Sequence, residues 1–285
     1  YKDVMLLVEN HNLTDNLDWI LICNDSNFCL GGNNAEKFTN RFSNILEREA
    51  KDRPDFISLN CNYDHDLHHQ SYFLCFSRII FKNKKFKNFW KTYIPLNNRY
   101  HAIEQGEKKL TKKILSRYKS NIMFTSHELS LYLKLNQQDQ NYLVANLPKV
   151  LFYLNLSFEE GENIQYETKT IIDSLENYNP SHVFGLLNIL FMDYPFLKKD
   201  VVRQGTFSFS QIFEVLHTKR LSINEDLRNE IMETLLKGGT SYSYRGSPKL
   251  AYQKGIPVEG PTYDVHYISM LLRMKAYWVT PKKNL

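Results

Sequence analysis

The chain lacks the features that mark integral membrane proteins and disulfide-rich scaffolds. No stretch of its 285 residues approaches the ~18 continuous apolar residues that a transmembrane helix requires. The first residues show no signal-peptide pattern. No two of the four cysteines form a CxxC pair, which argues against a zinc site and against a disulfide framework; they are Cys23, Cys29, Cys61 and Cys75. Buried free thiols in a reducing compartment are the favoured interpretation.

A strong excess of one charge is also missing. The formal net charge is +5, which favours contact with anions such as nucleotide phosphates or an acidic membrane surface but defines no fold. Tryptophan is scarce at 3 residues, whereas Phe and Tyr reach 18 each and the hydrophobic fraction is 42%. This composition can fill a sizeable core, in one large domain or two ordinary ones.

Hydrophobic periodicity divides the chain into two halves. Strands are predicted at 18–23, 55–59 and 71–76, with a short edge strand at 121–124, and helices at 1–10, 35–50, 82–91 and 103–118. The first strand is almost wholly apolar, as expected of a strand covered on both faces. Beyond residue 125 the pattern is helical, at 129–135, 142–154, 168–177, 181–191, 209–216 and 224–236. The order predicts a mixed α/β sheet with flanking helices, followed by a mostly helical extension.

Polar residues flank two of the predicted strands. Asn24, Asp25 and Ser26 follow the first strand, and His68-His69-Gln70-Ser71 leads into the third. Open α/β sheets bind ligands at the carboxyl ends of their strands. Two such polar segments in one chain therefore indicate a ligand site.

The chemistry of these segments leaves alternatives. Asp25 could hold a divalent metal that bridges nucleotide phosphates, or it could be an ordinary turn or cap residue. The Asp/His-rich stretch 64–69 has no standard metal-ligand spacing, so a structural or substrate-bonding role is favoured there. Gln70 and Ser71 carry neutral groups suited to sugar hydroxyls.

Glu107 is the candidate general base. It follows the flexible pair Gln105-Gly106 and is predicted to open a helix, where the helix dipole stabilises a carboxylate. In that case its role would be structural. As a general base, it would instead take the proton from an attacking hydroxyl. Glu104 is the rival carboxylate.

The segment Lys82–Lys91 combines three aromatic residues with five lysines. Such interleaving can bind nucleic acid. A surface helix that packs its aromatics and solvates its lysines is the favoured interpretation, and no nucleic-acid partner is expected.

In their order, these segments resemble the rhamnan synthesis F family of bacterial polysaccharide glycosyltransferases. The resemblance rests on Asp18–Ser26, His69–Leu74 with Phe76-Ser77, Phe86–Trp90, Glu107–Thr111, Asn179-Pro180-Ser181, Tyr194–Lys198 and Val202-Arg203. It departs from the family at Asn27–Leu30, where a Gly-Pro is usual, at Asn60-Cys61, where Thr-Asp is usual, and at Lys109, where the family has Gly. The family's first βαβ portion, which would hold the nucleotide base, would precede Tyr1.

The resemblance implies a GT-A-like nucleotide-sugar transferase. Residues 1–125 would be the C-terminal part of the transferase domain, 126–236 a helical extension, and 237–285 an unassigned segment. Asp25 would lie near the donor phosphates with Mg or Mn, Glu107 would be the base of an inverting enzyme, and substrate-binding residues would be Asn24, Ser26, His68, His69, Gln70 and Ser71.

The implied donor is a nucleotide sugar, with rhamnose among the candidates. The implied acceptor is a glycan or lipid-linked glycan of a capsule, O-antigen or cell wall. We expect a cytoplasmic protein with peripheral contact to the inner face of the cell membrane, through Lys82–Lys91 and the basic segment 273–283. The departures leave open the alternative of an inactive carbohydrate-binding or scaffold domain with the same fold.

Overall fold

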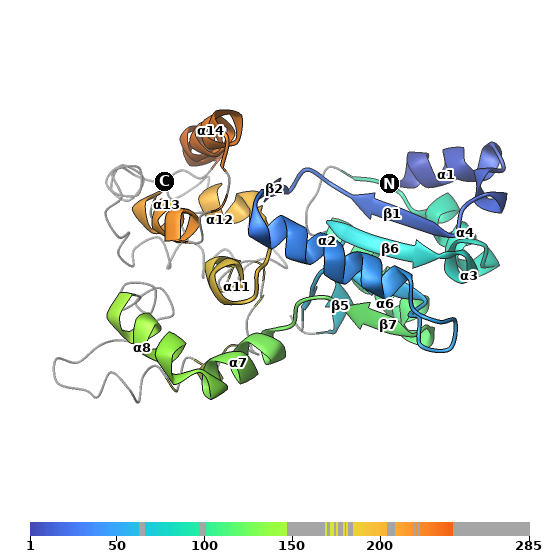
Figure 1. The fold of residues 1–285 in the computed structure, drawn as a ribbon. Coiled ribbons are helices and arrows are strands. Elements are labelled where there is room, and N and C mark those ends of the chain that lie inside the picture. Colours follow the sequence, from blue (N-terminus) through green and yellow to red (C-terminus); the bar gives the residue numbers. More distant parts are fainter. Residues whose placement is uncertain are drawn as a thin grey trace.

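The protein combines a small mixed sheet with a group of helices from its second half (Figure 1). This computed structural model describes residues 1–62, 66–96, 101–146, 185–203, 209–218 and 223–241, with seven single residues between 169 and 221. The predicted α/β class with flanking helices is confirmed. Most of the predicted helix 168–177, residues 147–154 of the predicted helix 142–154 and the basic segment 273–283 lie outside the described residues.

The main sheet has four strands in the order β1-β6-β3-β7. They are β1 (Trp19–Cys23), β6 (Phe73–Ser77), β3 (Phe56–Ser58) and β7 (Ser120–Ile122). β6 is antiparallel to both of its neighbours, and β3 is parallel to β7. The carboxyl ends of β1, β3 and β7 therefore lie at one end of the sheet. The chain enters β6 at that same end.

Of the predictions for the two edge strands, one is confirmed and the other is wrong. β7 is an edge strand, as predicted. The prediction that β1 is covered on both faces was wrong, because β1 forms the other edge and its burial alternates. Ile20 and Ile22 are buried, whereas Leu21 is 45% exposed. Apolar residues on the solvent side of an edge strand hid the alternation in the sequence.

Two short pairings connect distant segments. β2 (Asn27–Cys29) pairs antiparallel with β8 (Phe196–Lys198), and neither strand was predicted. The pairing is extended by Leu30 N–H, which donates to Pro195 O at 2.7 Å, and by Lys199 N–H, which donates to Ser26 O at 2.9 Å. β4 (Cys61–Asn62) pairs with β5 (His68–His69).

The helices largely follow the predicted periodicity. The first half contains α1 (Lys2–Asn10), η1 (Leu13–Asp15), α2 (Asn33–Leu46), α3 (Arg78–Phe81) and α4 (Lys84–Thr92). The predicted helix 103–118 is instead a π-helical segment η2 (Ala102–Lys108), then α6 (Lys109–Lys113) and a 3-10 turn η3 (Leu115–Arg117). The later helices are α7 (Ser126–Leu135), α8 (Gln137–Asn146), α11 (Gly185–Phe191), α12 (Lys199–Arg203), α13 (Phe209–Thr218) and α14 (Glu225–Ser241).

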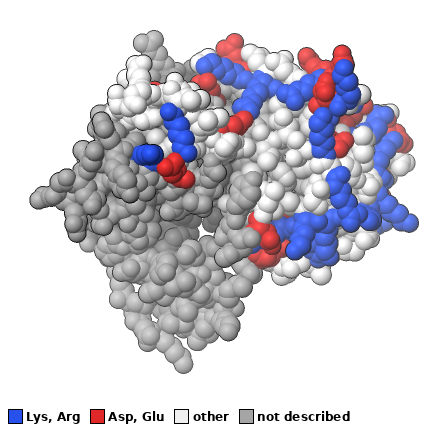
Figure 2. Space-filling view, turned by 90° about the horizontal axis from the view of Figure 1, so that it is seen from below, with Lys and Arg blue, Asp and Glu red and all other residues white. Residues whose placement is uncertain are grey.

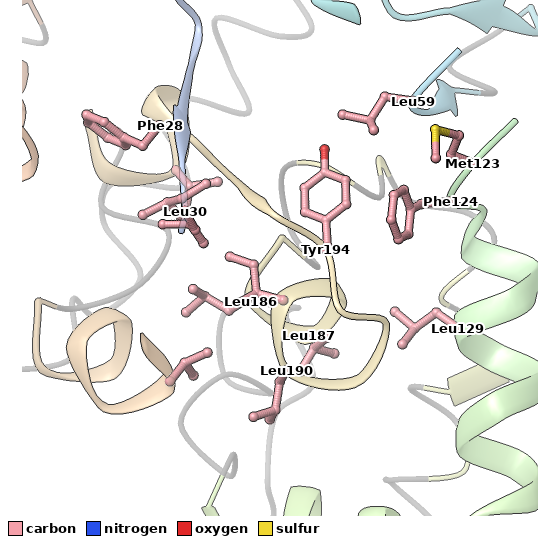
Figure 3. Packing of buried hydrophobic residues seen from close by; sticks show 14 of the residues in the cluster. Phe28, Leu30, Leu59, Met123, Phe124, Leu129, Leu186, Leu187, Leu190 and Tyr194 are labelled. Atoms are coloured by element: carbon pink, nitrogen blue, oxygen red, sulfur yellow. The ribbon is translucent and has the colours of Figure 1, made fainter. Parts of the chain in front are cut away.

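Buried apolar residues form two clusters. In one, α1, α3 and α4 pack against the sheet, and α4 contributes Phe86, Phe89 and Trp90. The other joins the sheet to α2, α7, α11 and α13. Figure 3 shows part of this second cluster, in which Tyr194 and the leucines of α11 lie near Phe124 and Leu129. Because this cluster spans residues on both sides of position 125, the predicted domain boundary there stays a prediction.

Candidate functional site

The sheet topology brings the two predicted polar segments together. The turn 24–26 leaves the carboxyl end of β1, and residues 68–72 lead into β6 beside it. Asn24 N–H donates to Tyr72 O at 3.4 Å and links the two directly. The fold thus brings the two polar segments together, as one shared ligand site requires. Asp25 follows an edge strand of the sheet and not a strand that is covered on both faces, as β1 was expected to be.

The turn that carries Asp25 is held by its neighbours. Asn24 Oδ1 accepts hydrogen bonds from Ser26 N–H at 3.1 Å and Ser26 Oγ at 2.5 Å, the pattern of an Asx turn. Asp25 is exposed, and among the described residues its carboxylate has no hydrogen bond or ion pair. The turn thus presents one carboxylate to solvent at the end of the sheet.

A metal ion at Asp25 stays a prediction. In the described part of the chain, no group of three or more His, Cys, Asp or Glu side chains is arranged to hold a metal. Asp64 and His65 lie outside that part. Mg²⁺ is commonly bound by one or two carboxylates together with substrate phosphates and water. A single carboxylate therefore fits a metal that arrives with a phosphorylated ligand.

Glu107 joins a helix to the segment before β6. Its Oε1 accepts a hydrogen bond from Ser71 N–H at 2.8 Å, and one turn later Thr111 Oγ1 accepts from His69 N–H at 3.1 Å. N–H groups two residues apart in an extended segment point to the same side, so one helix can satisfy both. These two bonds fix the position of the Glu107 carboxylate.

The prediction that Glu107 opens a helix was wrong. The helical turns begin at Ala102, and Glu107 lies near the junction of η2 with α6. The carboxylate therefore gains no stabilisation from a free helix N-terminus. π-helical segments are rare and frequently occur at functional sites. The rival Glu104 forms an ion pair with Lys108 at 2.7 Å.

His68 faces the second oxygen of this carboxylate. Its Nε2 lies 3.8 Å from Glu107 Oε2, and its Nδ1 lies 2.9 Å from Asp66 O. A carbonyl oxygen only accepts hydrogen bonds, so Nδ1 carries the hydrogen and the Nε2 lone pair of a neutral ring points towards the carboxylate. His68 Nε2 is thus held beside the carboxylate oxygen that Ser71 N–H does not contact.

His69 has a different environment from His68. It is buried, its Nδ1 lies 2.8 Å from Ser58 Oγ, and its ring packs edge-on against Phe56. Burial, and then the neighbouring His68, lower the pKa of His69 to about 4. His69 is therefore neutral at physiological pH, and its contacts favour a positioning role. Its predicted contact with substrate stays a prediction.

A buried network of amides and phenols lies behind this surface. Asn60 Oδ1 accepts hydrogen bonds from Tyr72 OH at 2.6 Å and Tyr194 OH at 2.9 Å, and Asn60 Nδ2 donates to Phe124 O at 2.9 Å. Gln70 Oε1 lies 3.0 Å from Tyr72 OH. Burial raises the pKa of both phenols well above the usual value, so both remain protonated donors.

Residues of the second half complete the network. Ser181 Oγ donates to Gln70 Oε1 at 3.0 Å, and Lys198 Nζ donates to Ser181 Oγ at 3.4 Å. Lys198 Nζ also lies 5.1 Å from the centre of the Tyr72 ring, within cation–π range. Sequence reasoning assigned no site role to these residues, although Ser181 and Lys198 belong to motifs that carry the family resemblance.

Tyr1 packs beside the segment that leads into β6. Its hydroxyl donates to Ser71 O at 2.8 Å, and its ring packs edge-on against Trp90. Burial raises the pKa of Tyr1, and the charges of Glu107 and Asp25 act in the same direction. Tyr1 thus lies within electrostatic reach of both predicted carboxylates. No sequence signal marked it.

Comparisons with known proteins agree with the resemblance found in the sequence. The model of the family described as rhamnan synthesis protein F matches residues 40–199, more than half of the chain. The matched region includes His68–Ser71, Glu107 and the buried network, whereas the turn with Asp25 precedes it. No curated protein and no solved structure matches. On the strength of the family match, the chain belongs to the rhamnan synthesis protein F family.

Proposed function

We propose that this protein is a GT-A-like glycosyltransferase that moves a sugar, with rhamnose the first candidate, from a nucleotide-sugar donor to a bacterial surface polysaccharide. Membership of a rhamnan synthesis family supports a role in polysaccharide assembly. The observation that carries the finer proposal is the convergence of Glu107, His68, Tyr1 and the Asp25 turn at one end of the sheet.

In the proposed reaction, Glu107 acts as the general base. Its Oε1 is held by Ser71 N–H, which leaves Oε2, beside His68, to accept the proton of the acceptor hydroxyl. The oxygen of the acceptor hydroxyl then attacks the anomeric carbon of the donor sugar, and the bond from this carbon to the donor phosphate breaks. The nucleoside diphosphate leaves with the electron pair.

Asp25 is proposed to stabilise the leaving group. An exposed carboxylate cannot attract phosphate directly, but it can hold a divalent cation such as Mg²⁺ or Mn²⁺ that bridges the phosphate oxygens. Asn24 and Ser26 shape this turn, and the acceptor would bind beside Ser71, next to the buried His68. The acceptor is proposed to be a glycan or a lipid-linked glycan.

The test is a transfer assay with the purified protein, a nucleotide-activated rhamnose and a glycan acceptor. Release of nucleoside diphosphate and a gain of one sugar mass on the acceptor are expected. Glu107→Gln keeps the bond to Ser71 N–H but cannot accept a proton, so we expect transfer to fall about 10²–10⁴-fold with little change in donor affinity.

Glu104→Gln is the matched control. It removes a carboxylate from the same helical segment, where it pairs with Lys108, and transfer should remain close to normal. Near-normal transfer by Glu107→Gln, or an equal loss in the two variants, would overturn the assignment of the base.

The alternative is an inactive carbohydrate-binding or scaffold domain. It is favoured by the structural bond between Glu107 and Ser71 N–H and by the engagement of His69 and Gln70 inside the protein. In that case the unmodified protein would bind the glycan without turnover, and Glu107→Gln would leave that binding intact.

A further inference from the structure

A basic groove lies between α4 and the segment formed by α6 and η3. Its volume is about 820 Å³, and six of its lining residues are Lys or Arg; they are Lys84, Lys85, Lys87, Lys91, Lys113 and Arg117. Glu9 is its one lining carboxylate and lies 3.6 Å from Lys87. In the described residues, the other five cations have no ion pair. The groove therefore has a large uncompensated positive charge.

Solvation of a surface helix explains only part of this charge. α4 buries Phe86, Phe89 and Trp90, so lysines on its outer side are expected. Lys113 and Arg117, however, come from the opposite wall. Like charges that face each other across a concave surface repel, and a bound anion relieves that repulsion. The groove thus has the charge distribution of an anion-binding site.

The groove lies away from the candidate active site. Residues 113–118 lead into the start of β7, whereas Asp25 and Asn60 follow the ends of β1 and β3. α1 spans the distance, since Tyr1 bonds to Ser71 at the site and Glu9 lines the groove. Figure 2 shows Lys and Arg gathered on the right of the molecule, the side on which Figure 1 places α3 and α4.

We propose that this groove seats the phosphate headgroups of an anionic lipid surface. Exposed apolar side chains on the adjoining α3 and η1 support this choice, because Ile79 on α3 is 64% exposed and Leu13 on η1 is 44% exposed. η1 is held against α3 and the start of α4 by Lys82 Nζ, which lies 2.9 Å from Asp15 Oδ1. Basic residues next to exposed apolar ones are typical of proteins that lie on a membrane surface.

The aromatics of α4 argue against a single-stranded nucleic acid as the occupant. Such ligands stack their bases on exposed aromatic rings. Here Phe86, Phe89 and Trp90 are at most 7% exposed, and their rings pack within the protein. No helix in the described part of the chain is long and apolar enough to cross a bilayer. Attachment through the groove would be peripheral and would leave the opposite end of the sheet open to substrate.

The inference is independent of the proposed reaction, because it is tested without donor or acceptor. The purified protein is sedimented with vesicles of phosphatidylcholine alone and with vesicles that contain one-third phosphatidylglycerol. We expect binding to the anionic vesicles only, with release at high salt. The double variant Lys85→Gln/Arg117→Gln removes one charge from each wall and should weaken binding roughly 25-fold, since each basic residue contributes roughly fivefold.

The matched control is Lys37→Gln/Lys134→Gln, which removes two exposed charges on α2 and α7, outside the groove. It should bind vesicles nearly as the unmodified protein does, and both double variants should keep the melting temperature. Equal weakening by the two double variants would overturn the groove as the site. Absence of binding to anionic vesicles, or displacement from them by a short oligonucleotide at stoichiometric concentration, would overturn the lipid as the ligand.

Discussion

The two ends of the sheet use polar residues in opposite ways. At the end with β5 and η2, polar side chains are buried and satisfy one another, as Asn60, Tyr72 and Tyr194 do. At the other end, lysines and an arginine are exposed and face solvent across a groove. Buried bonded groups have one geometry and can orient a reactive atom, whereas exposed cations attract anions without fixing their orientation. The contrast separates a candidate site for chemistry from a candidate site for attachment.

The largest effect on stability is expected at the buried end, from Asn60→Ala. The substitution removes the acceptor of two buried phenols and the donor to Phe124 O. Each unsatisfied buried group costs about 1–3 kcal/mol, so we expect the free energy of unfolding to fall by about 3 kcal/mol or more in urea titration. Tyr194→Phe removes a single hydroxyl and should cost only about 1 kcal/mol. An equal loss of unfolding free energy in the two variants would show that Asn60 does not support both phenols.

A pH titration sharpens the contrast further. The pKa of His69 is lowered to about 4 in the folded protein, whereas an unfolded histidine titrates near 6.5. The unfolded chain therefore binds the extra proton first as the pH falls, and stability is lost progressively between pH 6.5 and 4. From pH 7 to pH 5 we expect a loss of about 2 kcal/mol from this residue.

His69→Gln provides the comparison for that titration. The variant should be less stable at pH 7 because the ring contacts with Ser58 and Phe56 are lost. Its unfolding free energy should, however, fall less between pH 7 and pH 5 than that of the unmodified protein. If the unfolding free energy of the variant fell as much as that of the unmodified protein, the loss of stability would come from a group other than His69.

Asp25→Asn tests the exposed carboxylate of the turn that follows β1. Asn keeps the shape of the turn and removes the charge that a phosphate-bound metal needs. We expect nucleotide-sugar affinity to fall about tenfold in calorimetric titration with Mg²⁺ or Mn²⁺, which corresponds to about 1.4 kcal/mol. The melting temperature should stay the same. A matching loss of melting temperature would instead indicate a structural turn.

The smallest effect is expected for an exposed ion pair. Lys37 and Asp193 approach to 2.9 Å but remain accessible to water. Solvent screening reduces such pairs to about 0–1 kcal/mol. Lys37→Gln should therefore change the free energy of unfolding by less than about 0.5 kcal/mol. A larger change would mean that surface charges contribute to stability here as buried polar groups do.

The sequence predicted local features better than long-range ones. The strands near 19–23 and 73–77, the amphipathic α4 and the edge strand β7 were found because their patterns are contained in a few neighbouring residues. The proximity of Asp25 to His68–Ser71 followed from one rule about strand ends. The alternation of β1 was missed because Leu21 is apolar yet exposed.

The remaining features depend on contacts that no local pattern records. β2 and β8 are three residues each, too short for any periodicity. Asn60 and Tyr194 are 134 positions apart, and Tyr1 meets Ser71 across 70 positions. Glu107 was recognised as a candidate, but its position near the end of a π-helical segment and its bond with Ser71 N–H have no local sequence pattern. Such features become visible only when the chain is folded.

The pairing of β2 with β8 has a consequence for the order of folding during synthesis. The strand that follows the Asp25 turn has its partner at Phe196–Lys198, and Ser26 O receives its bond from Lys199 N–H. A ribosome must therefore make about 170 further residues before this turn can acquire its final support. Contacts at such sequence separation form late and slowly. The Asp25 turn is thus made long before its partner strand and can be fixed only after that strand has been synthesised.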